Sequence, residues 1–570
     1  MTGIASGKPW SRIGPEVAPT ASAASGIWTL QEASENLGAG VWPLPKEGLL
    51  FTYWYNESDA ATVAITRTTG RAGATVNAAG TKLLVGADTM KGSTGVRAVA
   101  WLEFDIATGA LTATNPSWYG NLPMYQIPGQ RINYDSNGNW GVAFNTNRNS
   151  YYILPSFSLF SSSLSNTWNM TVNWQSGWTD VSGSDGYIDF DDNDRPLIWY
   201  TMANDAWNPP RVTANLGVFP DTYAGGTGAP TWVATLEPAA SVGAPWYNNF
   251  VADGGCLADS SGNVYVHFVK AGHSGSTGSA VGFSKYNSSG TRQATIRYRT
   301  LNSDNGSSTN SGIVQIRPSF DEDGTHLYWA GKQAWQSPIS QVSSRTKMSN
   351  LEMGDTGSGT GWWRELVFTG GDATTNAFTN VNGASLSGDN SLMYQSGDSP
   401  AGSGTVAKGI VTCRLASTGV VQWLYKIENT LADGTSEFMT VMGMDVRGDF
   451  LYLNCSHQMG LGFYQGFTLK LKADGSTTGT NDFTVRNAAN DGTVACKMIV
   501  TKLTSGYTDT NVQVSNAPDN NAYKINEVAV TASYTTFGTT LLGTPAVPGT
   551  NSTDSFTNTG NTPGTATVGV

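Results

Sequence analysis

The sequence has few charged residues and no cluster of positive charge. Charged side chains make up 13% of its 570 residues, well below the roughly 25% that is typical of soluble domains. The net charge is −11 and the pI is near 4.9, with Lys and Arg scattered along the chain. A phosphate-binding surface needs the opposite balance, so we expect no nucleic-acid partner.

Long apolar runs are also missing. No stretch approaches the roughly 18 apolar residues that a membrane-spanning helix needs, and residues 1–20 lack the apolar centre of a secretory signal. We therefore expect no membrane span and a protein made in a cytoplasm. Its Ser-, Thr-, Gly- and Asn-rich composition is nevertheless usual for extracellular surfaces. A virion protein, assembled in the host cytoplasm and released by lysis, reconciles the two observations.

Cysteine and histidine are too sparse to suggest a metal centre. The four cysteines are far apart and show no C-x-x-C pair, so we predict small buried residues instead of zinc ligands or disulfides. They are Cys256, Cys413, Cys455 and Cys496. No cofactor and no metal site is expected.

What the chain does contain is a repeat. Asn/Asp/Ser/Gly turns followed by an aromatic and aliphatic strand recur at spacings of 55 to 69 residues, as in DSSGNVYVHFV (259–269). We place the central turn positions at Gly80, Gly138, Asn193, Gly262, Gly324, Gly388 and Gly448. A period of this size fits one four-stranded blade with generous loops. Seven copies predict an all-β propeller of about seven blades.

A second turn supports this period. Gly109, Gly290, Gly419 and Gly475 each lie 27 to 31 residues after a first turn. Hairpin turns that match the twist of strands need positive φ, which glycine tolerates best. Two offsets within one repeat are much harder to obtain by chance than one.

The repeats leave an arm at each end of the chain. We predict an N-terminal arm with a short helix at 27–40 over residues 1–59, the propeller over 60–480, and C-terminal strands with an extended tail over 481–570. The final stretch, rich in turn formers, is interpreted as either disordered or a strap ordered by a neighbour. We also predict that a strand from 52–69 closes the last blade.

One segment, SGIWTLQEASENLGAGVWPLP (25–45), resembles the "GVW-x-L…W-P" segment near the N terminus of structural and tail-fibre-like proteins of marine and cyanobacterial phages. The match rests on Gly26 to Leu30 and on Val41 to Pro43. The repeats also resemble the bacterial propeller repeat "D-x-x-G-N-x-Y-V…K-x-x-x-x-G", matched by Asp259, Gly262, Asn263, Tyr265, Lys285 and Gly290. The resemblance implies a virion protein of the tail, nozzle, baseplate or fibre, and it brings no catalytic motif.

The histidines are poor candidates for catalysis. His267 lies inside a predicted strand, His326 follows a turn, and His273 sits in a Gly/Ser loop without a nucleophile motif. His457 lies near Cys455 but lacks the third group that would orient a Cys–His pair. We predict structural roles for all four and no catalytic residue.

Two acidic clusters could supply the oxygen ligands that Ca²⁺ prefers: Asp189 to Asp194 and Asp321 to Asp323. They occupy the repeat position that uncharged residues fill in other copies, so turn formation explains them better. The segment 320–329 approaches a sialidase-type S-x-D-x-G-x-T-W box but lacks its leading Ser. Paired glycosidase carboxylates remain an open alternative.

Tryptophans near the predicted loops could stack on sugars or on a partner, although packing in a blade core explains each one better. They are Trp199, Trp207, Trp246, Trp329, Trp335, Trp362 and Trp363. We predict a non-enzymatic phage virion component whose partners are other virion proteins and copies of itself in a symmetric oligomer. The alternatives are an adhesin that binds a receptor or host surface glycan, and a propeller polysaccharide hydrolase or lyase.

Overall fold

In the computed structural model the chain separates into two compact units, Met1–Glu47 and Gly48–Val570. All described residues belong to the second unit, so the predicted helix at 27–40 lies outside them. The structure describes residues 48–56, 65–66, 73–91, 96–106, 111–117, 132–149, 152–164, 166–173, 183–204, 211–220, 230–238, 251–270, 280–300, 312–334, 340–352, 361–368, 381–398, 406, 408–431, 433–459, 463–486, 493–511, 514–516, 525–527, 533–536 and 555–558.

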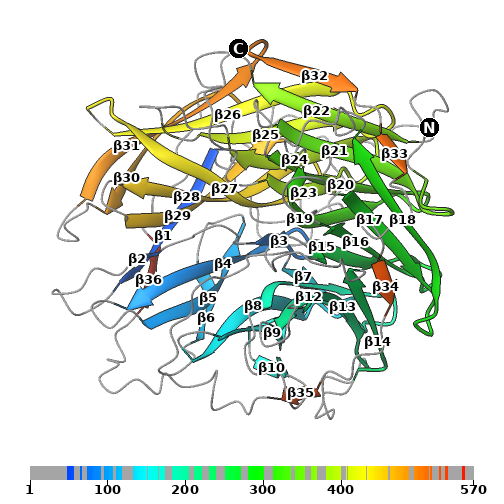
Figure 1. The fold of residues 1–570 in the computed structure, drawn as a ribbon. Coiled ribbons are helices and arrows are strands. Elements are labelled where there is room, and N and C mark those ends of the chain that lie inside the picture. Colours follow the sequence, from blue (N-terminus) through cyan, green and yellow to red (C-terminus); the bar gives the residue numbers. More distant parts are fainter. Residues whose placement is uncertain are drawn as a thin grey trace, which may run out of the picture. The chain divides into compact units, whose positions relative to one another are not determined.

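The described strands form an all-β propeller with six hydrogen-bonded sheets (Figure 1). Sheet 1 contains β2 (Ile65–Thr66), β3 (Ala74–Val76), β4 (Lys82–Lys91), β5 (Val96–Asp105) and β6 (Leu111–Ser117). Sheet 2 contains β7 (Asn133–Tyr134), β8 (Trp140–Asn149), β9 (Tyr152–Phe160), β10 (Asn166–Asn173) and β35 (Ser533–Thr536). Sheet 3 contains β11 (Gly183–Phe190), β12 (Pro196–Asn204), β13 (Arg211–Val218), β14 (Trp232–Pro238) and β34 (Ile525–Glu527).

The other three sheets continue the same up-and-down order. Sheet 4 contains β15 (Val251–Ala258), β16 (Val264–Lys270), β17 (Ala280–Tyr286), β18 (Arg292–Thr300) and β33 (Val514–Asn516). Sheet 5 contains β19 (Gly312–Glu322), β20 (His326–Ala334), β21 (Ser340–Lys347), β22 (Trp362–Phe368) and β32 (Tyr507–Asn511). Sheet 6 contains β23 (Val381–Leu386), β24 (Leu392–Asp398), β25 (Gly409–Leu415), β26 (Val421–Leu431), β27 (Ser436–Arg447), β28 (Phe450–Met459), β29 (Phe463–Lys472), β30 (Gly479–Arg486), β31 (Thr493–Leu503), β1 (Gly48–Asn56) and β36 (Ser555–Asn558).

Apolar side chains hold successive sheets face to face. One core cluster joins Tyr265 and Phe283 of sheet 4 to Trp329 of sheet 5, and its members are at most 4% exposed. Similar clusters bridge sheets 3 and 4 and sheets 5 and 6. Because both surfaces of such a sheet are covered, its strands can carry nearly continuous apolar runs. The part of the chain that the structure describes contains no helix long and apolar enough to span a membrane.

Both ends of the second unit are paired with the sheets. Strand β1 pairs antiparallel with β29, with Tyr53 opposite Gly466. This confirms the predicted closing strand for residues 52–56 of the range 52–69, whereas Ile65 and Thr66 pair with β4 of sheet 1. The C-terminal strands β31 to β36, here called the belt, pair in order with β26, β22, β18, β14, β10 and β1. Each belt strand thus covers the outer edge of a different set of blade strands (Figure 1).

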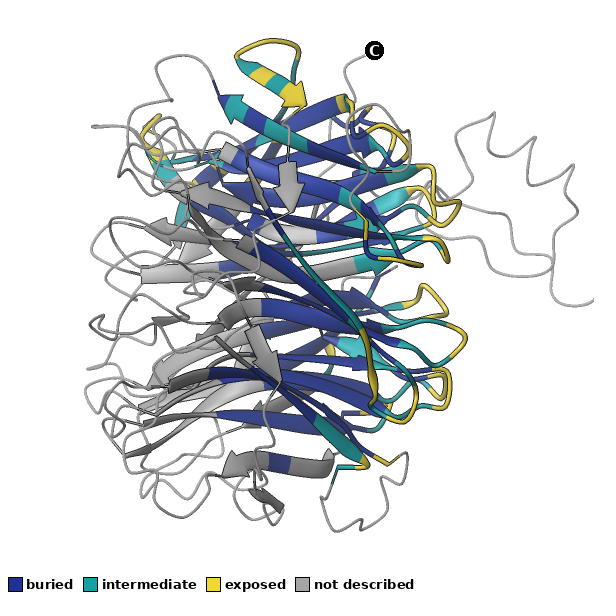
Figure 2. Ribbon diagram, turned by 45° about the vertical axis from the view of Figure 1, so that its right-hand side comes forward, coloured by how far each residue is buried: buried dark blue, intermediate teal, exposed yellow. Residues whose placement is uncertain are grey.

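The predicted turns are present, with two corrections. Positive φ occurs at Gly80, Gly138, Gly262, Gly324 and Gly448 as expected. In the other two turns the left-handed residue is Asp194 instead of Asn193, and Asn390 instead of Gly388. Both turns have five residues between their strands, and the left-handed residue is the fourth of them, as it is at Gly80, Gly138 and Gly262. Asp and Asn tolerate this conformation. These turns form exposed tips on one side of the propeller (Figure 2).

Candidate functional site

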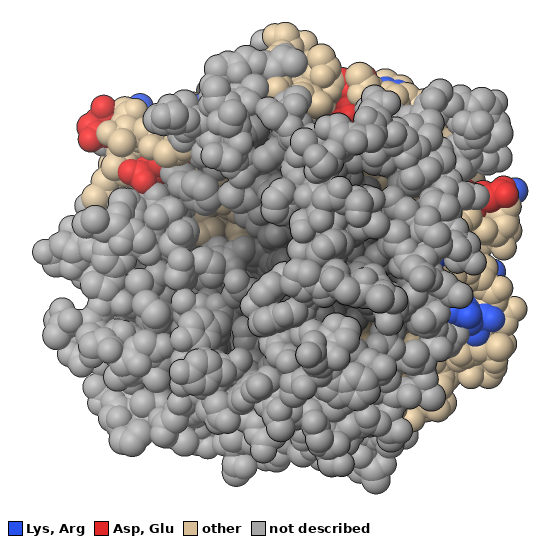
Figure 3. All heavy atoms as spheres, viewed as in Figure 1, with Lys and Arg blue, Asp and Glu red and all other residues tan. Residues whose placement is uncertain are grey.

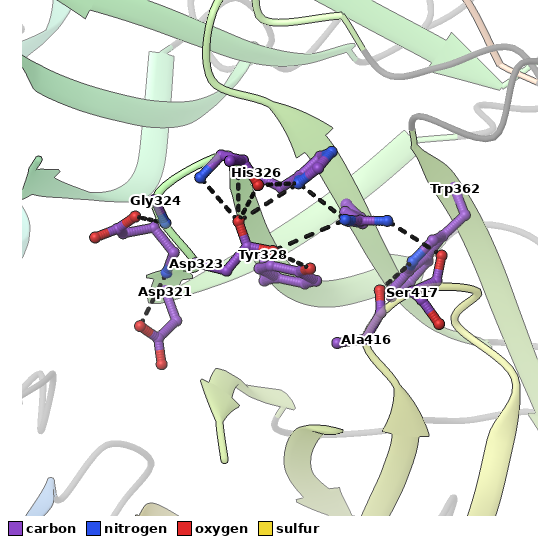
Figure 4. Close-up of polar contacts among 11 residues, drawn as sticks. Asp321, Asp323, Gly324, His326, Tyr328, Trp362, Ala416 and Ser417 are labelled. Atoms are coloured by element: carbon purple, nitrogen blue, oxygen red, sulfur yellow. Dashed lines mark hydrogen bonds and ion pairs between the residues drawn. The ribbon is translucent and has the colours of Figure 1, made fainter. Parts of the chain in front are cut away.

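The seam between sheets 5 and 6 carries a compact polar cluster (Figure 4). We call Asp323, His326, Tyr328, Arg345 and Ser417 the seam cluster. Asp323 lies in the turn after β19, and His326 and Tyr328 share one face of β20 because side chains alternate along a strand. Arg345 is directly opposite Tyr328 in the β20–β21 ladder. Ser417 belongs to the turn between β25 and β26 of the neighbouring sheet.

The carboxylate of Asp323 is saturated with donors. Its Oδ1 accepts hydrogen bonds from the backbone N–H of Thr325 at 2.9 Å and of His326 at 2.7 Å. Its Oδ2 accepts the Tyr328 hydroxyl at 2.8 Å. Burial opposes ionisation, but the hydrogen bonds from Thr325 and Tyr328 outweigh it and lower the pKa of Asp323 to about 2. A general acid needs a pKa near the working pH, so this carboxylate is unsuited to proton donation near neutrality.

Arg345 joins the two sheets. Its Nη1 donates to the carbonyl of Ser417 at 3.2 Å, and its Nη2 lies 2.9 Å from Nδ1 of His326. The guanidinium also lies over the Tyr328 ring, 5.8 Å from its centre. Burial and the bond to Asp323 raise the pKa of Tyr328, which keeps its hydroxyl neutral. The cluster therefore joins the two sheets through Arg345.

Carboxylates also join sheets directly, both at this seam and between β27 and sheet 1. Asp321 accepts the N–H of Glu322 at 2.9 Å and that of Leu386, across the seam, at 2.8 Å. Asp445 accepts the N–H of Val446 at 2.8 Å and that of Val76 at 2.7 Å, which links the end of β27 to the first sheet. These bonds join backbone groups of different sheets to an ionised acceptor, the stronger class of hydrogen bond.

The acidic clusters form turns, as predicted. Asp191 accepts the N–H of Asn193 at 3.0 Å and that of Arg195 at 2.9 Å, and its Oδ2 lies 2.6 Å from the Arg195 guanidinium. Asp189 accepts a side-chain hydrogen bond from Asn133 of sheet 2. Among the described residues, no group of three or more His, Cys, Asp or Glu side chains is arranged to hold a metal ion.

In three of the second turns, a tryptophan ring packs so closely that only glycine fits. Gly290, Gly419 and Gly475 have φ between 72° and 81°, and a Cβ on each would lie 2.5 to 2.6 Å from a tryptophan ring of the preceding blade strands. The rings belong to Trp232, Trp362 and Trp423. Two of them also donate to the turn they cover: Trp232 to the Ser288 carbonyl and Trp362 to the Ala416 carbonyl. The sequence revealed these glycines by their spacing but not the rings that require them.

The structure places two of the four histidines in detail. His267 is fully buried in β16, and burial lowers its pKa to about 3, so its ring is neutral. His326 belongs to the seam cluster. His457 lies on β28 opposite Met439, while His273 lies outside the described residues. The four cysteines are buried and unbridged.

Four of the seven tryptophans singled out from the sequence are core residues. Trp199, Trp329, Trp362 and Trp363 are at most 5% exposed, which confirms packing as their role. Trp207, Trp246 and Trp335 lie outside the described residues. Sequence reasoning missed Arg345 and Asp445, because each acts on a strand that is remote in sequence.

Where described residues are visible in Figure 3, acidic and basic side chains occur in small separate groups.

Comparisons with known proteins identify no family. No protein-family profile matches the chain, and no curated protein matches it. Among solved structures, a protein of unknown function from Dyadobacter fermentans is 10% identical with a TM-score of 0.32, over 65% of this chain and 99% of that one. The phage phi92 endosialidase is 11% identical with a TM-score of 0.32, over 78% and 71%. An endo-arabinase from Bacteroides thetaiotaomicron is 10% identical with a TM-score of 0.26, over 50% and 93%.

Proposed function

We propose that this chain is a non-enzymatic structural component of a phage virion, a rigid propeller placed in the tail or its attachment apparatus. The observation that carries the structural role is the pairing of both ends of the propeller unit with its outer strands. Strand β1 lies between β29 and β36, so the closing strand is held on both edges. A module closed in this way leaves few free strand edges at which other chains could pair and aggregate.

We further infer that the propeller has seven blades. Among the described residues, the sheet ladder between the two halves of sheet 6, β23–β26 and β27–β29, consists of two residue pairs, Asn429 with Glu437 and Thr430 with Ser436. A core cluster with Val411 and Tyr425 from one half and Leu453 and Phe467 from the other lies between them. This is how separate blades pack elsewhere in the molecule. Counting the halves separately gives seven four-stranded units closed by β1.

The chemistry of the described turns also supports a structural role. The carboxylates of Asp321, Asp323 and Asp445 all accept backbone hydrogen bonds that form a turn or join two sheets. Such groups stabilise the ring and are not free to bind substrate. The virion assignment itself rests on the resemblance of residues 25–45 to phage structural proteins.

The proposal is tested on particles produced by the phage whose genome encodes the chain. Antibodies raised against the recombinant propeller should label purified particles in electron micrographs, and mass spectrometry should recover the chain from them. In parallel, the recombinant chain should release no reducing ends from polysaccharides. Absence of the chain from particles would overturn the virion assignment, and saccharide release would establish the hydrolase alternative.

A further inference from the structure

We propose that the outer edge of β22, with Arg364 and Arg414, is a docking site for an extended strand that carries a carboxylate. Its occupant in this structure is the chain's own belt strand β32, through Asp509. By this proposal, the segment after Leu503 binds to the propeller as a separate peptide would, although it belongs to the same chain. This inference concerns the rim alone and does not depend on the virion role.

The strand supplies backbone pairing and two inward side chains. β32 is antiparallel to β22 over five residue pairs, from Phe368 with Tyr507 to Arg364 with Asn511. Exposure alternates along β32, so Tyr507 and Asp509 are partly buried whereas Thr508 and Thr510 are exposed. Main-chain pairing gives such a site affinity, and pockets for alternate side chains give it specificity.

Asp509 fills a carboxylate receptor built from two sheets. Its Oδ1 accepts a hydrogen bond from Nη1 of Arg414 at 2.7 Å, and its Oδ2 accepts one from Nη2 of Arg364 at 2.6 Å. Arg364 lies on β22 of sheet 5, and Arg414 lies on β25 of sheet 6. The strand therefore bridges the same seam as the seam cluster.

The Arg414 guanidinium makes this receptor selective for negative charge. Its side chain is 0% exposed, and burial lowers its pKa while Asp509 opposes that shift. Nη1 also donates to the Gly419 carbonyl at 2.7 Å. Nε and Nη2 have no acceptor among the described residues. A buried cation with so few described partners depends on the negative charge of Asp509, and an amide at that position would not provide it.

An apolar contact completes the site. Leu503 and Tyr507 of the belt pack against a cluster formed by Leu366, Phe368, Ile410 and Leu424. These four side chains come from β22 of sheet 5 and from β25 and β26 of sheet 6. An occupant is thus recognised by an aromatic residue and, two positions later, a carboxylate.

The turn 504–506 between β31 and β32 is exposed, which offers a place to cut the backbone of the folded, full-length chain. A protease recognition sequence is inserted there, the purified chain is cleaved, and retention of the C-terminal fragment is followed by gel filtration. The matched variants are Asp509→Asn at the receptor and Thr510→Ala on the outward face of the same strand.

We expect the cleaved wild-type and Thr510→Ala chains to retain the fragment, and Asp509→Asn to lose it at least about ten-fold faster. Equal retention by Asp509→Asn, or immediate loss from the wild type, would overturn the proposal. A second readout uses chain whose site has been emptied: the cleaved Asp509→Asn chain is separated from its C-terminal fragment, and a labelled synthetic peptide spanning residues 505–516 with the native sequence is added. It should be incorporated, while the same peptide with Asn at position 509 should not, and equal uptake of the two peptides would also refute carboxylate selection.

Discussion

Replacing Gly419 by alanine tests whether the second turns are fixed by tryptophan packing. Gly419 has a φ of 72°, and a Cβ there would lie 2.5 Å from Cε3 of Trp362 and 2.7 Å from Cγ of Arg364. The ring cannot move away freely, because Trp362 is 5% exposed and its Nε1 donates to the Ala416 carbonyl at 2.8 Å. The substitution therefore has two costs: it strains the backbone at position 419, and it overpacks the contact between sheets 5 and 6.

The chain contains a matched control in Gly434. Its φ is 86°, but apart from its two chain neighbours no atom of the described residues lies within 4 Å of a Cβ built on it. Gly434→Ala should cost only the left-handed backbone, about 1–2 kcal/mol. Gly419→Ala adds overpacking of about 1–3 kcal/mol and a weakened Trp362 hydrogen bond worth about 1 kcal/mol. We expect its free energy of unfolding to fall by about 3–6 kcal/mol, the sum of these three contributions.

Guanidinium denaturation of the two variants, followed by tryptophan fluorescence, measures this difference. The Gly419→Ala midpoint should lie clearly below that of Gly434→Ala, and amide exchange around residues 415–421 should accelerate only in the former. Equal midpoints would show that the φ requirement alone selects glycine, and the packing argument would then be wrong.

Three further predictions concern buried polar groups. Asp445→Ala leaves the N–H groups of Val446 and Val76 without their acceptor and should cost about 2–3 kcal/mol by denaturant titration; a change under about 0.5 kcal/mol would contradict the seam role. His267 is neutral in the fold, with a pKa lowered to about 3 from 6.5, so unfolding takes up a proton below pH 6.5 and stability should fall from there toward pH 3. His267→Phe should flatten that slope, and an unchanged slope would exclude His267 as its source. The pKa of Asp323 is lowered from 3.8 to about 2, so its ionised carboxylate stabilises the fold fully above pH 3.8, and this stabilisation is lost as the pH falls through about 2. The free energy of unfolding of Asp323→Asn should therefore depend less on pH below 3.8 than that of the wild type. The same pH dependence in both proteins would refute the role of Asp323.

The sequence predicted the architecture well because the propeller repeats its local chemistry. Turn formers such as Asp259 and Gly262 act within a few residues, so their spacing revealed the blades. The contacts that join blades are remote in sequence: Asp445 with Val76, and Asp509 with Arg414. No short-range pattern encodes such a pairing, which is why the belt was expected only as strands and a tail. The Trp362 and Gly419 contact was likewise hidden, although each residue was noticed separately.

The most direct test of the account is a cryo-electron microscopy map of the intact particle in which this chain is located. We predict density for a closed propeller built into a ring or collar of the tail, in contact with further copies and other virion proteins. An isolated knob at the distal end of a fibre would contradict the structural role and favour receptor binding.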